Sequence, residues 1–380
     1  MKIALVSPLF ESVPPRLYGG TERVVSYLTE ELARQGHSVT LFASGDSVTR
    51  ARLHPCCERS LRLAGCRDPW PPHVLMMEEV IQSASHFDVV HFHTDHLQLP
   101  FARHLKISAL TTMHGRLDLP ELLPLYRRFR DASLVSISDH QRRPLEFANW
   151  IGTVHHGLPP GMFTASTRPG SYLAFLGRIS PEKGPEKAIR IARRAGIALK
   201  IAAKVDRQDQ EFFEREVRPL LQGPGVEFIG EIGDADKSEF LGGALALLFP
   251  IDWPEPFGLV MIESIACGTP VIAFPCGSVP EILVDGVSGQ LVRNEDEAVA
   301  AARRIDELDR AACRRAFEER FTVERMARDY LQLYESIQEA HALSHRIASA
   351  RAARRSVSEV AAQEGAVIGP AGRITLPGTN

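Results

Sequence analysis

The chain has 380 residues, 44% of them hydrophobic and 24% charged, and its 47 acidic and 44 basic residues give a net charge of −3. This near balance argues against a dedicated nucleic-acid-binding protein, because no basic excess exists to displace counterions. No apolar run approaches the ~20 residues that span a bilayer, and the apolar stretch after Lys2 is too short for a secretion signal. The six cysteines form no CxxC pair, so we expect reduced thiols in a cytoplasmic protein.

The first 160 residues alternate between strand-like and helix-like patterns. Val24, Leu28 and Leu32 recur near helical spacing, with Thr21 as the expected N-cap and Gly36 as the expected C-cap. Strands that alternate with helices indicate a parallel sheet with crossover helices. The expected strands are short and rich in Val, Ile, Leu or Thr, and they lie at 2–8, 38–44, 88–93, 109–114, 133–138 and 153–157.

A stretch rich in proline and glycine at 156–170 interrupts this rhythm and is typical of a linker. After it, a helix is expected at 185–196 and another from about Gly258, with strands at 171–178, 198–204, 226–229, 244–249 and 270–274. We therefore predict an α/β protein of two doubly wound, Rossmann-like domains, residues 1–160 and 161–325. Its ligand would bind in the crevice at the carboxyl ends of both sheets.

The C-terminal part has a different pattern. One long amphipathic helix is expected at 326–341. The remaining residues, 342–380, are first rich in alanine and arginine and then poor in aromatics. We expect them to form a partly helical, partly disordered tail.

Two short stretches could bind phosphate. In GRISPEKG (177–184), Arg178 and Lys183 lie on the loop between a strand and a helix, where a guanidinium fork, an ammonium and a helix N-terminus would suit a diphosphate. The alternative is a solvated surface loop. In YGGTERVV, Gly19 and Gly20 precede a helix and would allow close approach of a phosphate or sugar; a tight turn explains them equally well. The dinucleotide pattern GxGxxG is absent from this turn.

Histidines follow two of the expected strands. His114 ends the strand at 109–114 and would face the crevice, or else be a hydrogen-bonded histidine of the core or rim. VVHFHTDH gathers potential metal ligands. A metal site there is conceivable but not favoured, because buried polar strand ends often have this composition. Its members would be His91, His93, Asp95 and His96.

Two glutamates flank the start of the helix at Gly258, in WPEPFGLVMIESIACGTP (253–270). Taken alone, Glu255 could simply favour the positive end of the helix, and Glu263 could be a solvated surface residue. GRISPEKG at 177–184, EPFGLVMIESIACGTPVIA at 255–273 and GGTERV at 19–24 together resemble the family-4 retaining glycosyltransferases of the GT-B fold. The resemblance covers roughly residues 1–335. It implies two Rossmann-like domains with a cleft between them and a C-terminal helix.

The resemblance also implies a role for each matching residue. Glu255 would hold hydroxyls of the transferred sugar, Glu263 would hold the ribose, and His114 would hydrogen-bond the donor sugar. Arg178 and Lys183 would stabilise charge on the leaving diphosphate, the part that a divalent metal plays elsewhere, so no metal and no cofactor are expected. The other donor-binding residues would be Gly19, Gly20, Gly258, Leu259 and Val260.

The implied activity is transfer of a hexosyl group from a nucleoside-diphosphate sugar to a saccharide, lipid or small-molecule acceptor, with retention of configuration. Two alternatives stay open: a nucleotide-sugar epimerase of the same architecture, and a non-catalytic nucleotide-sugar sensor. The basic stretches at 125–131 and 140–147 could touch an anionic membrane weakly, although solvated helix faces are the more usual interpretation. No nucleic-acid partner is expected.

Overall fold

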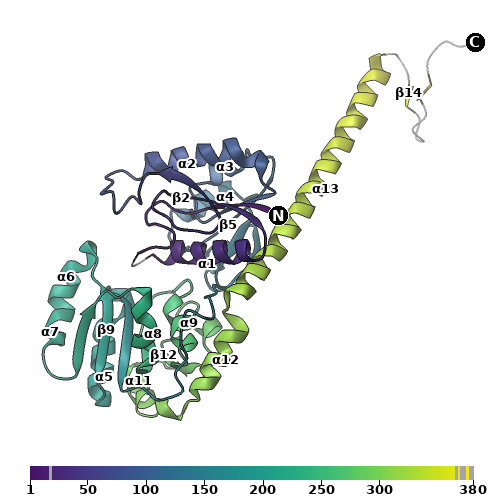
Figure 1. The fold of residues 1–380 in the computed structure, drawn as a ribbon. Coiled ribbons are helices and arrows are strands. Elements are labelled where there is room, and N and C mark those ends of the chain that lie inside the picture. The colour runs from purple at the N-terminus through teal and green to yellow at the C-terminus, as the bar shows by residue number, and fades with distance from the viewer. Residues whose placement is uncertain (17–18, 364–366, 369–373, 376–380) are drawn as a thin grey trace, which may run out of the picture. The chain divides into compact units, whose positions relative to one another are not determined.

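The computed structural model describes residues 1–16, 19–363, 367–368 and 374–375. Residues 1–331 form one compact unit, which contains two parallel sheets, and residues 332–380 form a second unit (Figure 1). Among the described residues, no helix combines the length and the apolar character needed to cross a membrane.

The first sheet has seven strands in the order β3-β2-β1-β4-β5-β6-β7, and every pairing is parallel. The direction of winding reverses between β1 and β4, which creates a crevice at the carboxyl ends of these strands. The strands are β1 (Lys2–Val6), β2 (Ser38–Ser44), β3 (Arg52–Cys57), β4 (Val89–Phe92), β5 (Ser108–Thr112), β6 (Leu134–Ser136) and β7 (Trp150–Thr153). The helices are α1 (Gly20–Arg34), α2 (Trp70–Ser83), α3 (Leu99–Ala102) and α4 (Leu122–Arg128).

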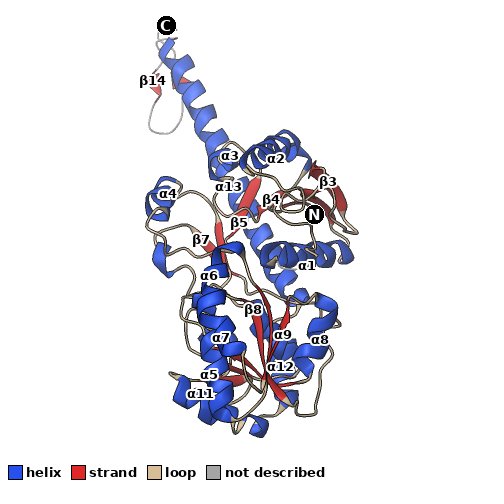
Figure 2. Cartoon of the chain, turned by 90° about the vertical axis from the view of Figure 1, so that its left-hand side faces the viewer, coloured by secondary structure: helices blue, strands red, loops and turns tan. Residues whose placement is uncertain are grey.

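The second sheet has six parallel strands in the order β10-β9-β8-β11-β12-β13, with its reversal between β8 and β11. Its strands are β8 (Tyr172–Arg178), β9 (Leu199–Lys204), β10 (Val226–Gly230), β11 (Ala244–Phe249), β12 (Val271–Ala273) and β13 (Gly289–Leu291). Its helices are α5 (Pro185–Ala195), α6 (Gln210–Phe212), α7 (Arg218–Leu221), α8 (Asp234–Gly242), α9 (Leu259–Ala266), α10 (Val279–Ile282), α11 (Glu295–Ala302) and α12 (Arg310–Arg320). In Figure 2 this sheet stands between α5, α7 and α11 on one side and α8, α9 and α12 on the other.

Apolar strands buried on both faces hold the second sheet in place. Leu173 and Phe175 of β8 and Ile201 of β9 belong to one buried cluster with Ile189 and Ala192 of α5. The apolar residues of α5 follow helical spacing, so one face of the helix covers the sheet. This packing fixes the loops that leave the carboxyl ends of the strands.

Most expected elements occur within one or two residues of their predicted bounds, but some predictions need correction. The strand expected at 153–157 lies at Trp150–Thr153. Strands β3 and β13 were not expected, because β3 is a half-exposed strand at the sheet edge and β13 has only three residues. Thr21 is not the N-cap of α1, which is Gly19, and the C-cap is Gln35, with the left-handed Gly36 following it.

The C-terminal helix α13 (Val323–Gln363) is longer than the expected 326–341. Residues 342–363, the first part of the tail expected to be partly helical and partly disordered, are helical, as their many alanines and arginines favour. Two short strands follow, β14 (Val367–Ile368) and β15 (Ile374–Thr375). The rest of the expected tail lies outside the described residues. The two sheets fall on either side of residue 160, but both belong to the unit 1–331, so the domain ranges 1–160 and 161–325 stay a prediction.

Candidate active site

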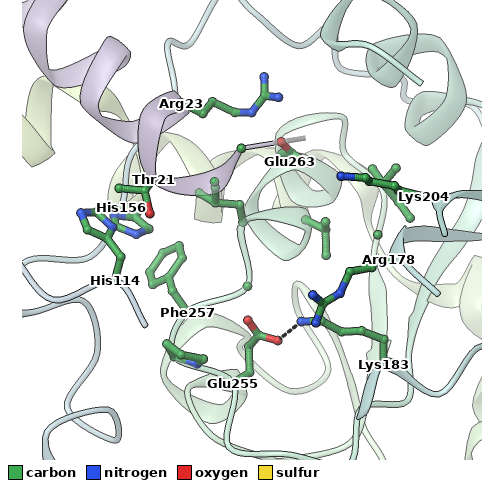
Figure 3. Close-up of a pocket in the computed structure, with 18 of the residues that line it drawn as sticks. Thr21, Arg23, His114, His156, Arg178, Lys183, Lys204, Glu255, Phe257 and Glu263 are labelled. Carbon is green, nitrogen blue, oxygen red and sulfur yellow. Dashed lines mark hydrogen bonds and ion pairs between the residues drawn. The ribbon is translucent and has the colours of Figure 1, made fainter. Parts of the chain in front are cut away.

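The loops at the carboxyl ends of both sheets surround a cavity of about 760 Å³ (Figure 3). Every site residue predicted from the sequence lines it. From the first sheet these are Gly19, Gly20 and His114, and from the second sheet Arg178, Lys183, Glu255, Gly258, Leu259, Val260 and Glu263. Segments far apart in the sequence therefore meet at one site.

The two predicted cations lie on one side of the cavity. Arg178 is the last residue of β8, where the strand expected at 171–178 also ends, and its guanidinium donates to Glu182 at 2.6 Å. Lys183 lies in the short turn before α5 and forms an ion pair with Glu255, drawn as the dashed line in Figure 3. The Lys183 ammonium also lies 4.8 Å from the centre of the Trp253 ring. Both side chains are largely buried, so they are not part of a solvated surface loop.

Glu255 is held in a rigid loop. Its side chain is buried and accepts a hydrogen bond from the Trp253 indole N–H at 3.0 Å, and its backbone carbonyl accepts from the Ser278 N–H at 2.9 Å. A Cβ at Gly277, whose φ is 63°, would lie 2.3 Å from the Glu255 nitrogen, so only glycine fits there. Glu255 thus projects its carboxylate toward Lys183 from a fixed backbone.

Glu263 lies inside α9 and is not a solvated surface residue, because only 1% of it is exposed. Its Oε1 accepts a hydrogen bond from Lys237 at 2.7 Å. Its Oε2 is buried and has no hydrogen-bond partner among the described residues. One carboxylate oxygen of this cavity-lining residue thus lacks a hydrogen bond among the described residues.

Helix α9 begins at the cavity. Its N-cap, Gly258, has φ 81°, a left-handed conformation that favours glycine. The first backbone N–H groups of a helix have no partner within the helix. Leu259 and Val260, the first two residues of α9, both line the cavity.

The glycine pair at the start of α1, Gly19 and Gly20, lies opposite α9. A Cβ at Gly19 would lie 2.7 Å from the Cβ of Pro15, so a tight approach of chain segments does require glycine there. A Cβ at Gly20 would meet only Leu259 of α9, at 3.9 Å. The pair brings backbone from the first sheet close to the start of α9.

His114 follows β5 and forms part of the cavity wall. Its Nε2 lies 2.8 Å from Nδ1 of His93, its backbone N–H donates to Asp95 at 3.2 Å, and its ring stacks on His156 with centres 5.4 Å apart. Burial lowers the pKa of His114 to about 4, against the opposing effect of the Asp95 carboxylate. The imidazole is therefore neutral at physiological pH.

The metal site considered at 91–96 does not form. His93 contacts His114 instead, and Asp95 accepts the His114 backbone N–H. In the described part of the chain, one group alone brings three potential ligand atoms within 4.8 Å of one another, and none of its members lines the cavity: His54, Cys56 and Glu79.

Several residues of the cavity wall were not predicted. Lys204 ends β9, so the rule that indicated His114 would also have indicated Lys204. Arg23 and Lys237 lie within helices, where no spacing marks them.

Glu22 is buried in the first turn of α1, and this burial raises its pKa to about 7. The wall also includes the aromatic residues Trp253 and Phe257 and the histidine His156.

Comparison with known proteins agrees with this arrangement. Residues 166–319 match the family model described as glycosyl transferases group 1, and residues 18–146 match the model described as glycosyltransferase family 4. The phosphatidyl-myo-inositol mannosyltransferase of Mycolicibacterium smegmatis is 26% identical, over 80% of this chain and 83% of that protein.

Solved structures share the fold. AviGT4, a glycosyltransferase involved in avilamycin A biosynthesis, has a TM-score of 0.69 at 24% identity, over 89% of this chain and 98% of that one. HepE of Anabaena, solved with UDP and glucose, has a TM-score of 0.67 at 18% identity, over 88% and 100%. The class of protein is thus a glycosyltransferase with the GT-B fold. The chain belongs to the family-4 glycosyltransferases.

Proposed function

We propose that the protein transfers a hexosyl group from a nucleoside-diphosphate sugar to a hydroxyl acceptor, with retention of the anomeric configuration. The observation that carries this proposal is the single cavity in which a cation pair, the N-terminus of α9 and two buried glutamates converge. The binding of UDP and glucose by HepE, a protein of the same fold, supports a nucleotide-sugar donor.

The leaving diphosphate would lie between the cations and α9. Arg178 can bind two oxygens with its fork, Lys183 adds a point charge, and the amides at the start of α9 add hydrogen bonds. Charge that develops on the leaving oxygen would then be stabilised by groups already in place. Because Lys183 is paired with Glu255, a bound diphosphate would share this ammonium with the carboxylate.

The two glutamates would bind different hydroxyls. Glu255, before the helix, is close to Lys183 and would hold the transferred sugar together with His114. Glu263, inside the helix, would hold the ribose, and its Oε2 offers an acceptor that no described group occupies. A ribose hydroxyl there would satisfy a buried oxygen that is otherwise left without a hydrogen bond.

The acceptor would attack from the same face as the leaving group. We infer that the leaving phosphate oxygen helps to deprotonate the acceptor hydroxyl, since no side chain stands out as a nucleophile. Closure of the cleft would exclude water and so favour the acceptor over hydrolysis. We further propose that the reaction needs no metal, because Arg178 and Lys183 already neutralise the diphosphate.

The acceptor and the cellular location also belong to this proposal. A saccharide, a lipid or another small molecule would each supply the hydroxyl, and we propose that the transfer takes place in the cytoplasm. Weak contact of the basic stretches 125–131 and 140–147 with an anionic membrane stays part of the proposal. Arg127 and Arg130 in the first stretch lie over the ring of Phe147, 5.8 and 5.4 Å from its centre, and both remain exposed.

The test is a thermal-shift panel of UDP, GDP and ADP sugars, followed by transfer assays with the donor that raises the melting temperature. A ligand that binds only the native state stabilises it, so the right donor should produce a clear shift. NMR of the product gives the anomeric configuration. An inverted product contradicts retention, epimerised donor without acceptor favours the epimerase, and binding without transfer to any acceptor favours the sensor.

A further inference from the structure

Four histidine rings form a row that leads from the interior of the first sheet to the cavity. The centres of His91 and His93 are 4.0 Å apart, those of His93 and His114 are 5.1 Å apart, and those of His114 and His156 are 5.4 Å apart. Figure 3 shows His114 and His156 side by side at the edge of the cavity. His93 is fully buried and does not line the cavity, so the roles described above give it none.

A single hydrogen bond joins the rings of His93 and His114, so one proton lies between the two nitrogens. His93 Nδ1 lies 2.8 Å from His114 Nε2, which is a hydrogen-bond distance. Burial lowers the pKa of both imidazoles, and the neighbouring rings of His91 and His156 lower that of His93 further, while Asp95 opposes the effect on His114. Both rings are therefore neutral. A neutral imidazole has one N–H and one acceptor nitrogen, so one ring donates to the other.

The surroundings of His93 decide which ring donates. Its second nitrogen, Nε2, is buried and has no hydrogen-bond partner among the described residues. Among buried backbone groups, N–H donors without an acceptor are rarer than under-satisfied carbonyl acceptors, and we apply the same order to the two ring nitrogens. His93 therefore carries its proton on Nδ1 and donates it to Nε2 of His114.

We propose that His93 is a positioning residue that fixes the tautomer of His114. Because His114 Nε2 accepts from His93, its own proton lies on Nδ1, the ring nitrogen left for a ligand in the cavity. His114 then presents a hydrogen-bond donor to an oxygen of the bound substrate, not a base. The identity of that oxygen as a sugar oxygen rests on the function proposed above; the tautomer does not.

The direct test is the tautomer of His114, read from its ring nitrogen shifts by NMR on ¹⁵N-histidine-labelled protein. His114→Phe identifies its signals. We expect the Nδ1–H form in the wild type. In His93→Phe, which keeps a ring but removes the donor, the signals should move toward the Nε2–H form. In His93→Asn, whose amide nitrogen lies near the place of Nδ1, the Nδ1–H form should persist.

His91→Phe is the matched control. It removes another buried histidine, in β4 two residues before His93, whose Nε2 lies 2.7 Å from Thr112 Oγ1. It should leave the His114 tautomer unchanged. An Nε2–H form in the wild type, no change in His93→Phe, or an equal change in His91→Phe would overturn the proposal.

Kinetics give the second arm. His93→Phe should lower kcat/KM for the sugar donor roughly tenfold, the effect of one weakened hydrogen bond. In a His114→Phe background the same substitution should have no further effect, because His93 acts only through His114. Equal losses in both backgrounds would mean general damage and would contradict the proposal. If no donor supports turnover, the proposed function fails, while the NMR arm still decides the tautomer.

Discussion

Glu255, in the loop before α9, and Glu263, inside α9, have different surroundings. Glu255 is paired with Lys183 and hydrogen-bonded by the Trp253 indole. Glu263 is paired with Lys237 through one oxygen, and the other oxygen has no partner among the described residues. The two carboxylates therefore face different parts of the cavity and are expected to bind different parts of the donor.

Calorimetry on two variants tests this division. Glu263→Ala should weaken binding of both the bare nucleoside diphosphate and the nucleotide sugar, by ~1.5–3 kcal/mol for a hydrogen bond to a charged group. Glu255→Ala should leave the affinity for the bare diphosphate nearly unchanged, because the carboxylate is expected to contact the transferred sugar, and should reduce affinity or turnover for the sugar donor. Equal losses of affinity for the bare nucleotide in the two variants would mean that the two carboxylates bind the same part of the donor.

Arg178 allows a matched comparison of two arginines. Arg178→Ala should lower kcat about ten- to a hundredfold, as expected from ~1.5–3 kcal/mol of charge-assisted hydrogen bonding. Arg190→Ala removes an exposed arginine that pairs with Glu295 outside the cavity, and it should leave turnover unchanged. Full activity of the Arg178 variant with its cognate donor would remove this residue from the site.

The charges of Arg178 and Lys183 also predict whether the reaction needs a metal ion. If Arg178 and Lys183 neutralise the leaving diphosphate, transfer should proceed at the same rate after dialysis against excess EDTA. The measurement is initial rate with and without EDTA, and again after addition of magnesium or manganese. A strict requirement for either ion would refute the metal-free mechanism.

At the scale of elements, the start of α9 depends on a left-handed glycine. A Cβ at Gly258 would lie 2.8 Å from Cε of Met261 and 3.4 Å from Cγ of Glu255. Gly196, which ends α5, is also left-handed at φ 76°, but a Cβ there would meet nothing within 4 Å. The two glycines share the backbone requirement and differ in their surroundings.

Alanine at each position separates these effects. Both variants should lose ~1–2 kcal/mol of stability from the left-handed backbone, seen as a lower melting temperature. Only Gly258→Ala should also weaken donor binding, because its Cβ crowds Glu255 and the first turn of α9. Equal donor affinities in the two variants would contradict a role of the α9 start in binding.

At the scale of the whole compact unit, one glutamate connects the segments of the two sheets. The carboxylate of Glu281, in α10, accepts the backbone N–H groups of Asp139 and His140, both at 2.7 Å, and lies 3.4 Å from His155 Nε2. Burial alone would raise the pKa of Glu281, but these hydrogen bonds outweigh it and lower the pKa. The connection therefore depends on the charged form.

This connection predicts a dependence of stability on pH. Because the pKa of Glu281 is lower in the folded state, its contribution is complete above the ordinary glutamate pKa of ~4.3 and is lost as the pH falls through the folded-state value. At neutral pH the wild type should have a higher melting temperature than the Glu281→Gln variant, by the equivalent of ~1 kcal/mol of stability. This difference in melting temperature should shrink as the pH is lowered. A difference that stays constant down to acid pH would rule out this origin.

Local patterns predicted most strands because a strand buried on both faces needs a continuous apolar run, as in YLAFLGR of β8. The ten candidate site residues, expected from short motifs and from the family resemblance, all line one cavity. A short motif carries part of its own geometry: Glu255, Gly258 and Glu263 lie within nine residues of sequence. Strand β3 and the extent of α13 were missed, since a half-exposed edge strand lacks such a run and the α13 sequence has no clear stop signal before residue 363.

The sequence by itself thus determined the two-sheet α/β plan, the motifs and the family. Only the tertiary structure decided which charged and polar side chains of these motifs pair with one another. Lys183 meets Glu255 across 72 residues, Glu281 meets His140 across 141, and His93 meets His114 from a neighbouring strand. Such pairs leave no periodic signal, because which side chains meet depends on how sheets and helices pack, and packing is a property of the whole chain.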